Sequence, residues 1–169
     1  FRYRWGPAHE LFGVTPDLIC FGKAIANGMP LSAIAGPRQI MRLLEDDVFF
    51  SMTFGGEALS LAACAATLKA LRDPEAYPHL WAVGARLQQG LAMLIACYGL
   101  QAHVQCLGRA PRTVVTFCDG EGRDSLLVKS LFQQEALKRG ILFNGLQLPS
   151  TAHTAEDIDL TLGAFQEVL

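Results

Sequence analysis

One short segment, residues 16–30, constrains the fold of this chain more than any other. Its apolar run, residues 18–21, ends in Gly22-Lys23 and is followed by small residues. A brief apolar run between turn-forming residues predicts a buried strand, and residues 32–35 predict a second strand. Open α/β folds bind their ligands where strands end, at the carboxyl edge of the sheet. The segment therefore predicts an α/β fold in which Lys23 lies at a ligand-binding edge.

Most lysines are solvated surface charges, so this alternative must be weighed for Lys23. The other lysines, Lys69, Lys129 and Lys138, lie in helix-like segments where a solvated face is expected. Lys23 instead follows an apolar run and Gly22, and it precedes small residues. Desolvation by such neighbours would favour a neutral, nucleophilic amine. An amine of this kind can form a Schiff base with a carbonyl compound, most often the aldehyde of pyridoxal phosphate.

Three groups of residues give the chain a family resemblance. Residues 13–18, Gly22-Lys23 and Gly28-Met29-Pro30 are similar to the lysine signature of class III pyridoxal-phosphate aminotransferases, above all to the glutamate-1-semialdehyde aminomutase-like branch. Residues 51–62 resemble the second signature of this class, and residues 150–159 resemble its C-terminal segment. The resemblance therefore covers the whole chain, in the right order.

The resemblance implies a fold-type-I transferase and gives roles to two residues. Lys23 would be the Schiff-base lysine, and thus both catalytic and cofactor-binding. Thr53 would bind the cofactor phosphate in the site of the neighbouring subunit, so that a homodimer shares its sites. Residues 1–73 would end the large mixed-sheet domain that binds the cofactor, and residues 74–169 would form the small α+β C-terminal domain.

By the same resemblance, this chain holds only the later part of the family's site. The acid that pairs with the pyridine nitrogen would lie just upstream of Phe1, and the phosphate loop and the stacking aromatic residue further upstream. The protein environment of the ring tunes how well the cofactor accepts electrons. We therefore expect a C-terminal fragment of an enzyme that is inactive alone.

The segment 57–71 is rich in Ala, Leu and Cys and predicts a helix that is apolar nearly all round. Such a helix is buried in a large core or at a subunit interface, and a chain of 169 residues favours the interface. Gly55-Gly56 precede the helix, and Thr53 precedes them. The first N–H groups of the helix, its dipole and the Thr53 hydroxyl together predict an anion site for a phosphate.

The second half of the sequence predicts helices that cover a small sheet. A long helix, broken or kinked around Pro78, is expected over about residues 75–98. A second helix is expected over 125–139, ended by Gly140, and a last helix begins at Thr154, with Asp157 at the capping-box position. The stripe of the last helix is Ile158, Leu162, Phe165 and Leu169. Strands are expected over 104–107, 113–117 and 141–143.

Composition excludes several classes of function. The chain is 51% hydrophobic and 18% charged with a formal net charge of −2, which suits a globular core and argues against nucleic acid or an anionic membrane as partner. No stretch is expected to span a bilayer, and no signal peptide is visible. The cysteines are odd in number and form no CxxC pair, so we expect buried free thiols, no metal site and a cytoplasmic location.

The sequence favours a pyridoxal-phosphate aminotransferase that acts on an amino acid or amino-carbonyl substrate. Two alternatives stay open: a 2,1-aminomutase of the glutamate-1-semialdehyde type, and a noncatalytic interaction module. Residues 140–169 contain no Arg or Lys, so they cannot supply the arginine with which some class members grip a substrate carboxylate. Asn144 and Gln147 are either substrate contacts or plain turn residues.

Overall fold

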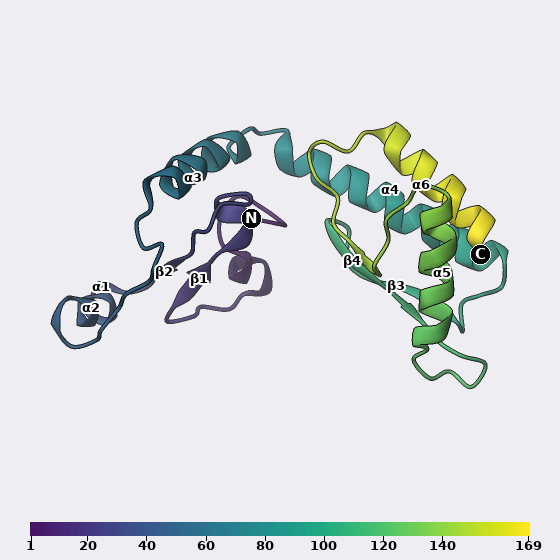
Figure 1. The fold of residues 1–169 in the computed structure, drawn as a ribbon, viewed down its shortest axis with the longest axis horizontal. Coiled ribbons are helices and arrows are strands. Elements are labelled where there is room, and N and C mark those ends of the chain that lie inside the picture. The colour runs from purple at the N-terminus through teal and green to yellow at the C-terminus, as the bar shows by residue number, and fades with distance from the viewer. The chain divides into compact units, whose positions relative to one another are not determined.

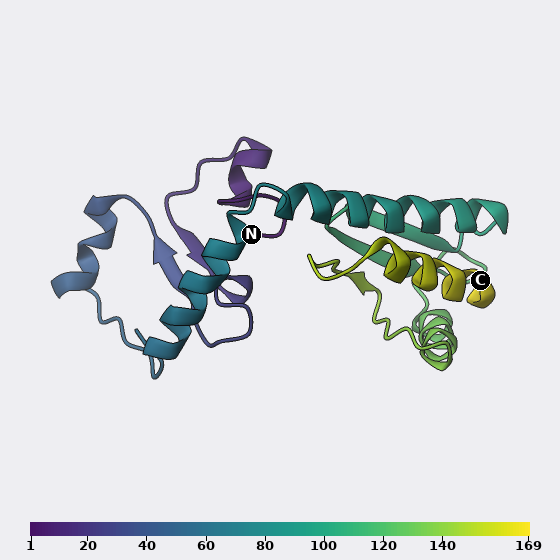
Figure 2. The same ribbon diagram turned by 90° about the horizontal axis from the view of Figure 1, so that it is seen from above.

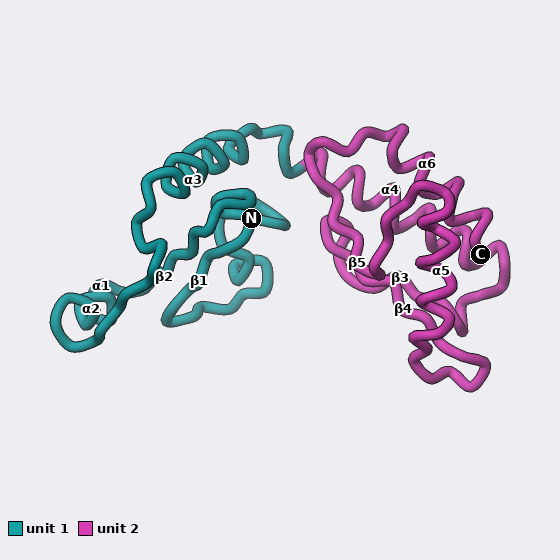
Figure 3. Tube along the Cα trace, in the orientation of Figure 1, with its two compact units in different colours: residues 1–77 teal, residues 78–169 magenta.

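The computed structural model describes all residues, 1–169, and the ribbon is shown from two directions (Figure 1, Figure 2). The chain forms two compact units, Phe1–Tyr77 and Pro78–Leu169 (Figure 3). The division between them follows residue 77, whereas the boundary expected from the sequence follows residue 73. The assignment of the two parts to a large and a small domain stays a prediction.

The first unit is built on a two-stranded antiparallel sheet. Strand β1 (Ile19–Phe21) pairs with β2 (Ala33–Ala35), with Cys20 opposite Ile34. These strands confirm the two that the sequence predicts in this region. The other elements are η1 (Ala8–Phe12), η2 (Lys23–Ile25), α1 (Arg38–Met41), α2 (Leu43–Asp46) and α3 (Ala58–Leu71).

The first unit has a small core and a large exposed apolar surface. Its buried apolar side chains are Ile25, Ala26 and Ala76. Helix α3, expected to be covered on most faces, leaves Leu59 62% and Leu61 49% exposed. Apolar side chains of α3 that were expected to be buried are therefore exposed in this chain.

The second unit packs three helices on a three-stranded antiparallel sheet. The strands β3 (Val104–Arg109), β4 (Arg112–Phe117) and β5 (Leu146–Gln147) lie in the order β3-β4-β5. The helices are α4 (Ala76–Cys97), which starts at the end of the first unit, α5 (Leu126–Lys138) and α6 (Ala155–Val168). Helices α4 and α6 run side by side (Figure 2).

The core of this unit follows from the apolar periodicity of its helices. Helix α4 buries a stripe of apolar side chains at helical spacing. Four phenylalanine rings, from β4, α5, the segment before β5 and α6, contact one another with centroids 5.0–6.3 Å apart. The stripe is Leu80, Val83, Leu87, Leu91 and Ile95, and the rings are Phe117, Phe132, Phe143 and Phe165.

Local capping signals are confirmed. The Thr154 hydroxyl accepts from Asp157 N at 3.2 Å, and the Asp157 carboxylate accepts from Thr154 N at 2.7 Å, so the predicted capping box starts α6. Ser125 caps α5, and Gly140 follows that helix with φ +82°, in the left-handed region.

Three further expectations are wrong. Pro78 neither breaks nor kinks α4, because it lies in the first turn, where its missing N–H has no helical partner to lose. Residues 141–143 form no strand; instead Gly145 O accepts from Val115 N at 2.7 Å, and Gln147 pairs with Thr113. None of the five cysteines is buried, although all are free.

The expectation that no stretch is long and apolar enough to span a bilayer is wrong for helix α4. By length and composition alone its 22 residues could cross a bilayer. Its apolar side chains include the stripe that packs in the core of the second unit, and core helices pass the same test of length and composition. The protein itself therefore buries the side chains of this stripe, and no membrane is needed to cover them.

Glycines on the helices allow a stability prediction. A Cβ at Gly84 would lie 2.0 Å from the backbone O of Ala110, whereas a Cβ at Gly163 would meet nothing within 4 Å. We expect Gly84→Ala to destabilise the chain by about 1–3 kcal/mol, because a backbone atom cannot yield as a side chain can. Gly163→Ala should stabilise it by up to about 1 kcal/mol through helix propensity. Urea unfolding of both variants checks this, and equal effects would contradict the packing of α4 on the hairpin.

Candidate active site

Lys23 lies where the chain turns sharply after β1. Gly22 ends the strand, and Lys23 opens η2 with φ +49°, in the left-handed region. The turn is closed by Ile25 N, which donates to Gly22 O at 3.3 Å, and by Ala26 N, which donates to Lys23 O at 3.4 Å. A left-handed conformation costs a non-glycine residue about 1–2 kcal/mol. Such strain occurs often at functional positions.

The environment of Lys23 differs from the expected one. Its side chain is exposed and has neither a hydrogen bond nor an ion pair, whereas Ile25 and Ala26, two and three residues further along the chain, are buried. The expectation that apolar neighbours desolvate this amine is therefore wrong for the residues of this chain. The chain offers a free amine on a fixed turn, and any desolvation must come from elsewhere.

Thr53 lies on a tight loop before α3. Gly55 N donates to Met52 O at 3.1 Å, and Glu57 N donates to Phe54 O at 3.3 Å, which makes two consecutive turns. The Thr53 side chain is exposed, and its hydroxyl has no partner in the chain. Helix α3, which follows, lies against η2, so the fold brings the two signature segments together. No hydrogen bond joins Lys23 to Thr53.

The N-terminus of α3 is already occupied by a side chain. The carboxylate of Glu57 accepts from Leu59 N at 2.8 Å, from Ser60 N at 2.6 Å and from the Ser60 hydroxyl at 2.6 Å. The bond from the Ser60 hydroxyl, followed by those from the two backbone N–H groups, lowers the pKa of Glu57. The expectation that the start of this helix and Thr53 jointly bind an anion is therefore wrong for Leu59 N and Ser60 N.

This cap makes a pH-dependent contribution to stability. Because its folded pKa is lowered, ionised Glu57 stabilises the fold fully above its ordinary value of 4.5, and the contribution disappears as the pH falls through the folded value. Glu57→Gln should therefore be less stable than the unmodified chain at pH 7, and the difference should shrink in acid. Urea unfolding followed by the amide signals of α3 measures this, with the exposed Glu75→Gln as control. A difference that persists unchanged in acid would contradict the cap.

Asn144 and Gln147 belong to the second unit and have different roles. Asn144 is exposed and its Oδ1 accepts from Leu146 N at 2.9 Å, which is the turn role. Gln147 is only 6% exposed and lies on β5, so it is not a turn residue. Its Oε1 accepts from the Thr113 hydroxyl at 2.6 Å and from Cys106 Sγ at 3.6 Å.

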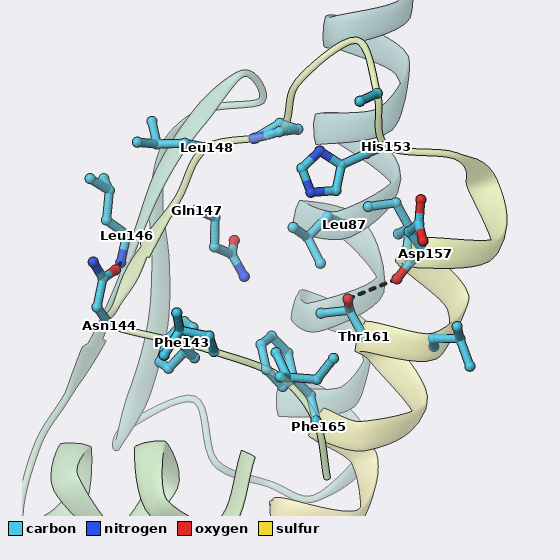
Figure 4. A pocket seen from close by; sticks show the side chains of 17 residues that line it. Leu87, Phe143, Asn144, Leu146, Gln147, Leu148, His153, Asp157, Thr161 and Phe165 are labelled. Carbon is cyan, nitrogen blue, oxygen red and sulfur yellow. Dashed lines mark hydrogen bonds between the residues drawn. The ribbon is translucent and has the colours of Figure 1, made fainter. Parts of the chain in front are cut away.

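Gln147 also lines a mainly apolar cavity of about 850 Å³ between β5, α4 and α6 (Figure 4). Its Nε2 is buried without a hydrogen-bond partner. Burial, the larger effect, raises the pKa of the neighbouring Cys106 thiol. The hydrogen bonds of Gln147 to Thr113 and Cys106 give it a structural role in the sheet.

The described residues hold no group of His, Cys, Asp or Glu side chains that could bind a metal ion. Sequence reasoning did not recognise Glu57 as the cap of α3. The signal was present, because Glu57 precedes Ser60 by three residues, the spacing at which the two side chains meet across a helix start.

Comparison with known proteins identifies what this chain is similar to. The family model described as aminotransferase class-III matches residues 5–169. The glutamate-1-semialdehyde 2,1-aminomutases of Thermus thermophilus and Desulforudis audaxviator are each 36% identical, over 100% and 99% of this chain and 42% and 41% of their own lengths. The chain thus spans about two fifths of the curated relatives it matches.

Solved structures give the same result. The FumI protein of Sphingopyxis sp. MTA144, in its PLP internal aldimine form, matches 99% of this chain and 39% of its own with a TM-score of 0.88 and 28% identity. A β-phenylalanine aminotransferase from Variovorax paradoxus matches 98% of this chain and 41% of its own with a TM-score of 0.86 and 26% identity.

Proposed function

Because the chain belongs to the class III aminotransferase family, we propose that it is part of a pyridoxal-phosphate-dependent aminotransferase in which Lys23 holds the cofactor. The family resemblance and the expected fold of a PLP transferase are confirmed by the family model and by the similar structures. The observation that carries the proposal for Lys23 is its free amine on a strained turn, directly after β1, at the lysine signature.

The cofactor fits the two signature residues in part. Pyridoxal phosphate, when bound, supplies an electron-accepting ring that stabilises negative charge on the substrate. Lys23 Nζ has no competing partner, and it can bind an aldehyde covalently. The Thr53 hydroxyl is likewise free to donate to a phosphate oxygen. The Glu57 cap, by contrast, leaves two N–H groups of α3 unavailable to that phosphate.

Lys23 has a second role in the proposed reaction. Once the substrate amine displaces it, Nζ is a free base at the end of β1. From there, with the cofactor bound, Lys23 would act as the general base that takes a proton from the α-carbon of the substrate and as the acid that returns it. The chain alone supplies an amine and a hydroxyl with little enclosure, so we expect the isolated chain to be inactive.

We further propose that the whole protein is a homodimer that shares its sites. The exposed apolar side chains around α3 and the loop before it support this proposal, because contiguous apolar surface marks interaction sites. They include Phe49, Phe50, Met52, Phe54, Leu59 and Leu61.

An aminomutase is the second candidate, because the curated relatives compared above carry that name. A single-turnover assay of the whole protein separates the two. With an amino donor and no acceptor, an aminotransferase should release about one equivalent of carbonyl product per site. An aminomutase should instead convert its own substrate to an isomer without net release. Neither result with any amino donor or amino-carbonyl substrate would contradict the proposed function.

A further inference from the structure

The cavity beside Gln147 has the features of a binding site for a small molecule. We propose that it binds an uncharged compound with an apolar body and a carbonyl oxygen, and that the Gln147 amide donates a hydrogen bond to that oxygen. All residues that line the cavity belong to the second unit, whereas Lys23 and Thr53 belong to the first. The proposal therefore goes beyond the proposed function and does not depend on it.

The size and the lining of the cavity suit a small ligand. Its volume is about 850 Å³, and pockets that bind small molecules have volumes of about 300–1,000 Å³. It lies on the helix-covered face of the three-stranded sheet, between β5, α4 and α6 (Figure 4). Apolar side chains dominate the lining, among them Leu87 of α4, Phe143, and Ile158 and Phe165 of α6. Contact with these side chains would remove the apolar body of a ligand from water, which favours binding.

A buried hydrogen-bond donor faces this apolar space. Gln147 is only 6% exposed, and Figure 4 shows the nitrogen end of its side chain pointing into the cavity. Oε1 accepts from the Thr113 hydroxyl at 2.6 Å, which fixes the orientation of the amide group. Nε2 is buried and has no hydrogen-bond partner. Because an unsatisfied buried donor is costly, an acceptor brought by a ligand would be recognised at this point.

The cavity is a poor site for a bound water. The Thr161 hydroxyl already donates to Asp157 O at 2.7 Å. Asn144 Oδ1 already accepts from Leu146 N at 2.9 Å. A buried water ordinarily makes about three hydrogen bonds, and these two oxygens of the lining are engaged. A single acceptor on an apolar body fits one buried amide donor among apolar side chains better than water does.

The charges of the lining favour an uncharged ligand. None of the lining residues is Lys or Arg, so an anion would enter without a fixed positive partner, which is costly. The one lining carboxylate, that of Asp157, accepts from the backbone N and the hydroxyl of Thr154 at 2.7 and 2.9 Å. It would repel an anion and is engaged in the capping box of α6. A carbonyl oxygen is the acceptor that meets these conditions without a charge.

Two probes of equal shape test the proposal. Acetophenone carries a carbonyl oxygen, and α-methylstyrene has a CH₂ group in its place. The whole protein, labelled at its Leu and Ile methyl groups and its glutamine amides, is titrated with each probe and followed by NMR, without an amino donor. Acetophenone should shift the Gln147 amide and the methyl groups of Leu87 and Ile158 to a plateau. α-Methylstyrene should bind about two- to tenfold more weakly, because it lacks the acceptor for one neutral hydrogen bond.

Variants at two positions show whether the preference comes from this cavity. Gln147→Met keeps a side chain of similar length without the donor, so it should bind the two probes equally. Ala152 is exposed and lines the cavity, so it lies where the cavity opens to solvent. Ala152→Phe should weaken the binding of both probes, and it leaves the bond between Gln147 and Thr113 untouched if the methionine variant fails to fold. Ala102, an exposed alanine in a turn of the same unit, does not line the cavity, so Ala102→Phe should change nothing.

Three results would overturn the proposal. The first is equal binding of the two probes to the unmodified protein, or no shift of the Gln147 amide at saturating acetophenone. The second is a preference for acetophenone that survives Gln147→Met. The third is binding that Ala152→Phe leaves unchanged. Labelling of Lys23 by the cofactor tests the proposed function through a residue of the first unit, so the two proposals can fail separately.

Discussion

Replacing Lys23 by alanine in the whole protein should lower the rate of amino-group transfer by about 10²- to 10⁴-fold. This range is what a positioned general base contributes, and the loss of covalent attachment to the cofactor adds to it. The free amine of Lys23 is held at the end of β1 by a turn in the left-handed region. Steady-state kinetics with saturating cofactor measure the effect.

Lys69→Ala is the matched control. Lys69 is an exposed lysine in the last turn of α3, and its removal should leave the rate within a factor of about two, as expected for a solvated surface residue. A Lys23→Ala protein that retained most of its activity would show that the catalytic amine is elsewhere.

Mixing two impaired chains should restore activity if Thr53 completes the site of a partner subunit. A heterodimer of Lys23→Ala and Thr53→Ala chains would carry both lesions in one site and none in the other. It should therefore show up to half the wild-type activity per dimer. Loss of a hydrogen bond to a charged phosphate costs about 1.5–3 kcal/mol, or roughly ten- to a hundredfold in cofactor affinity, so the assay is run at limiting cofactor.

The Thr53→Ala homodimer alone gives the baseline for this mixture. If Thr53 acts within its own subunit, every site of the heterodimer carries one lesion, and mixing restores nothing above that baseline. The same result would follow if no dimer forms, so the oligomeric state is measured by sedimentation in parallel. A monomer would contradict the shared site directly.

Local signals in the sequence predicted much of the fold. The capping box of Thr154 and Asp157 and the stop at Gly140 depend on residues only a few positions apart, and the structure has them as expected. The two strands on either side of Lys23 could also be predicted, because turn-forming residues flank each of them.

The pairing of strands far apart in the sequence could not be predicted as well. The apolar run 141–143 looked like a strand, yet β4 is paired by Gly145 and β5, which depends on where a distant strand ends. Pro78 looked like a helix breaker because its position relative to the helix start could not be fixed to within one turn.

The candidate site shows the same division. The order and spacing of Lys23 and Thr53 carried the family resemblance, and the family model confirms it. Burial could not be predicted, because the exposure of Lys23 depends on which segments cover it. The occupied start of α3 was not predicted either, because Gly55-Gly56 suggested an anion site, whereas the Glu57 carboxylate already accepts from Leu59 N and Ser60 N.

Reductive trapping tests the central claim about Lys23 most directly. The whole protein, loaded with pyridoxal phosphate, is treated with borohydride, digested and mapped by mass spectrometry. We expect one pyridoxyl label per chain, on the peptide that contains Lys23, and none in the Lys23→Ala variant. A label on Lys69, Lys129 or Lys138 instead, or no stable label at all, would contradict the assignment of Lys23 as the residue that holds the cofactor.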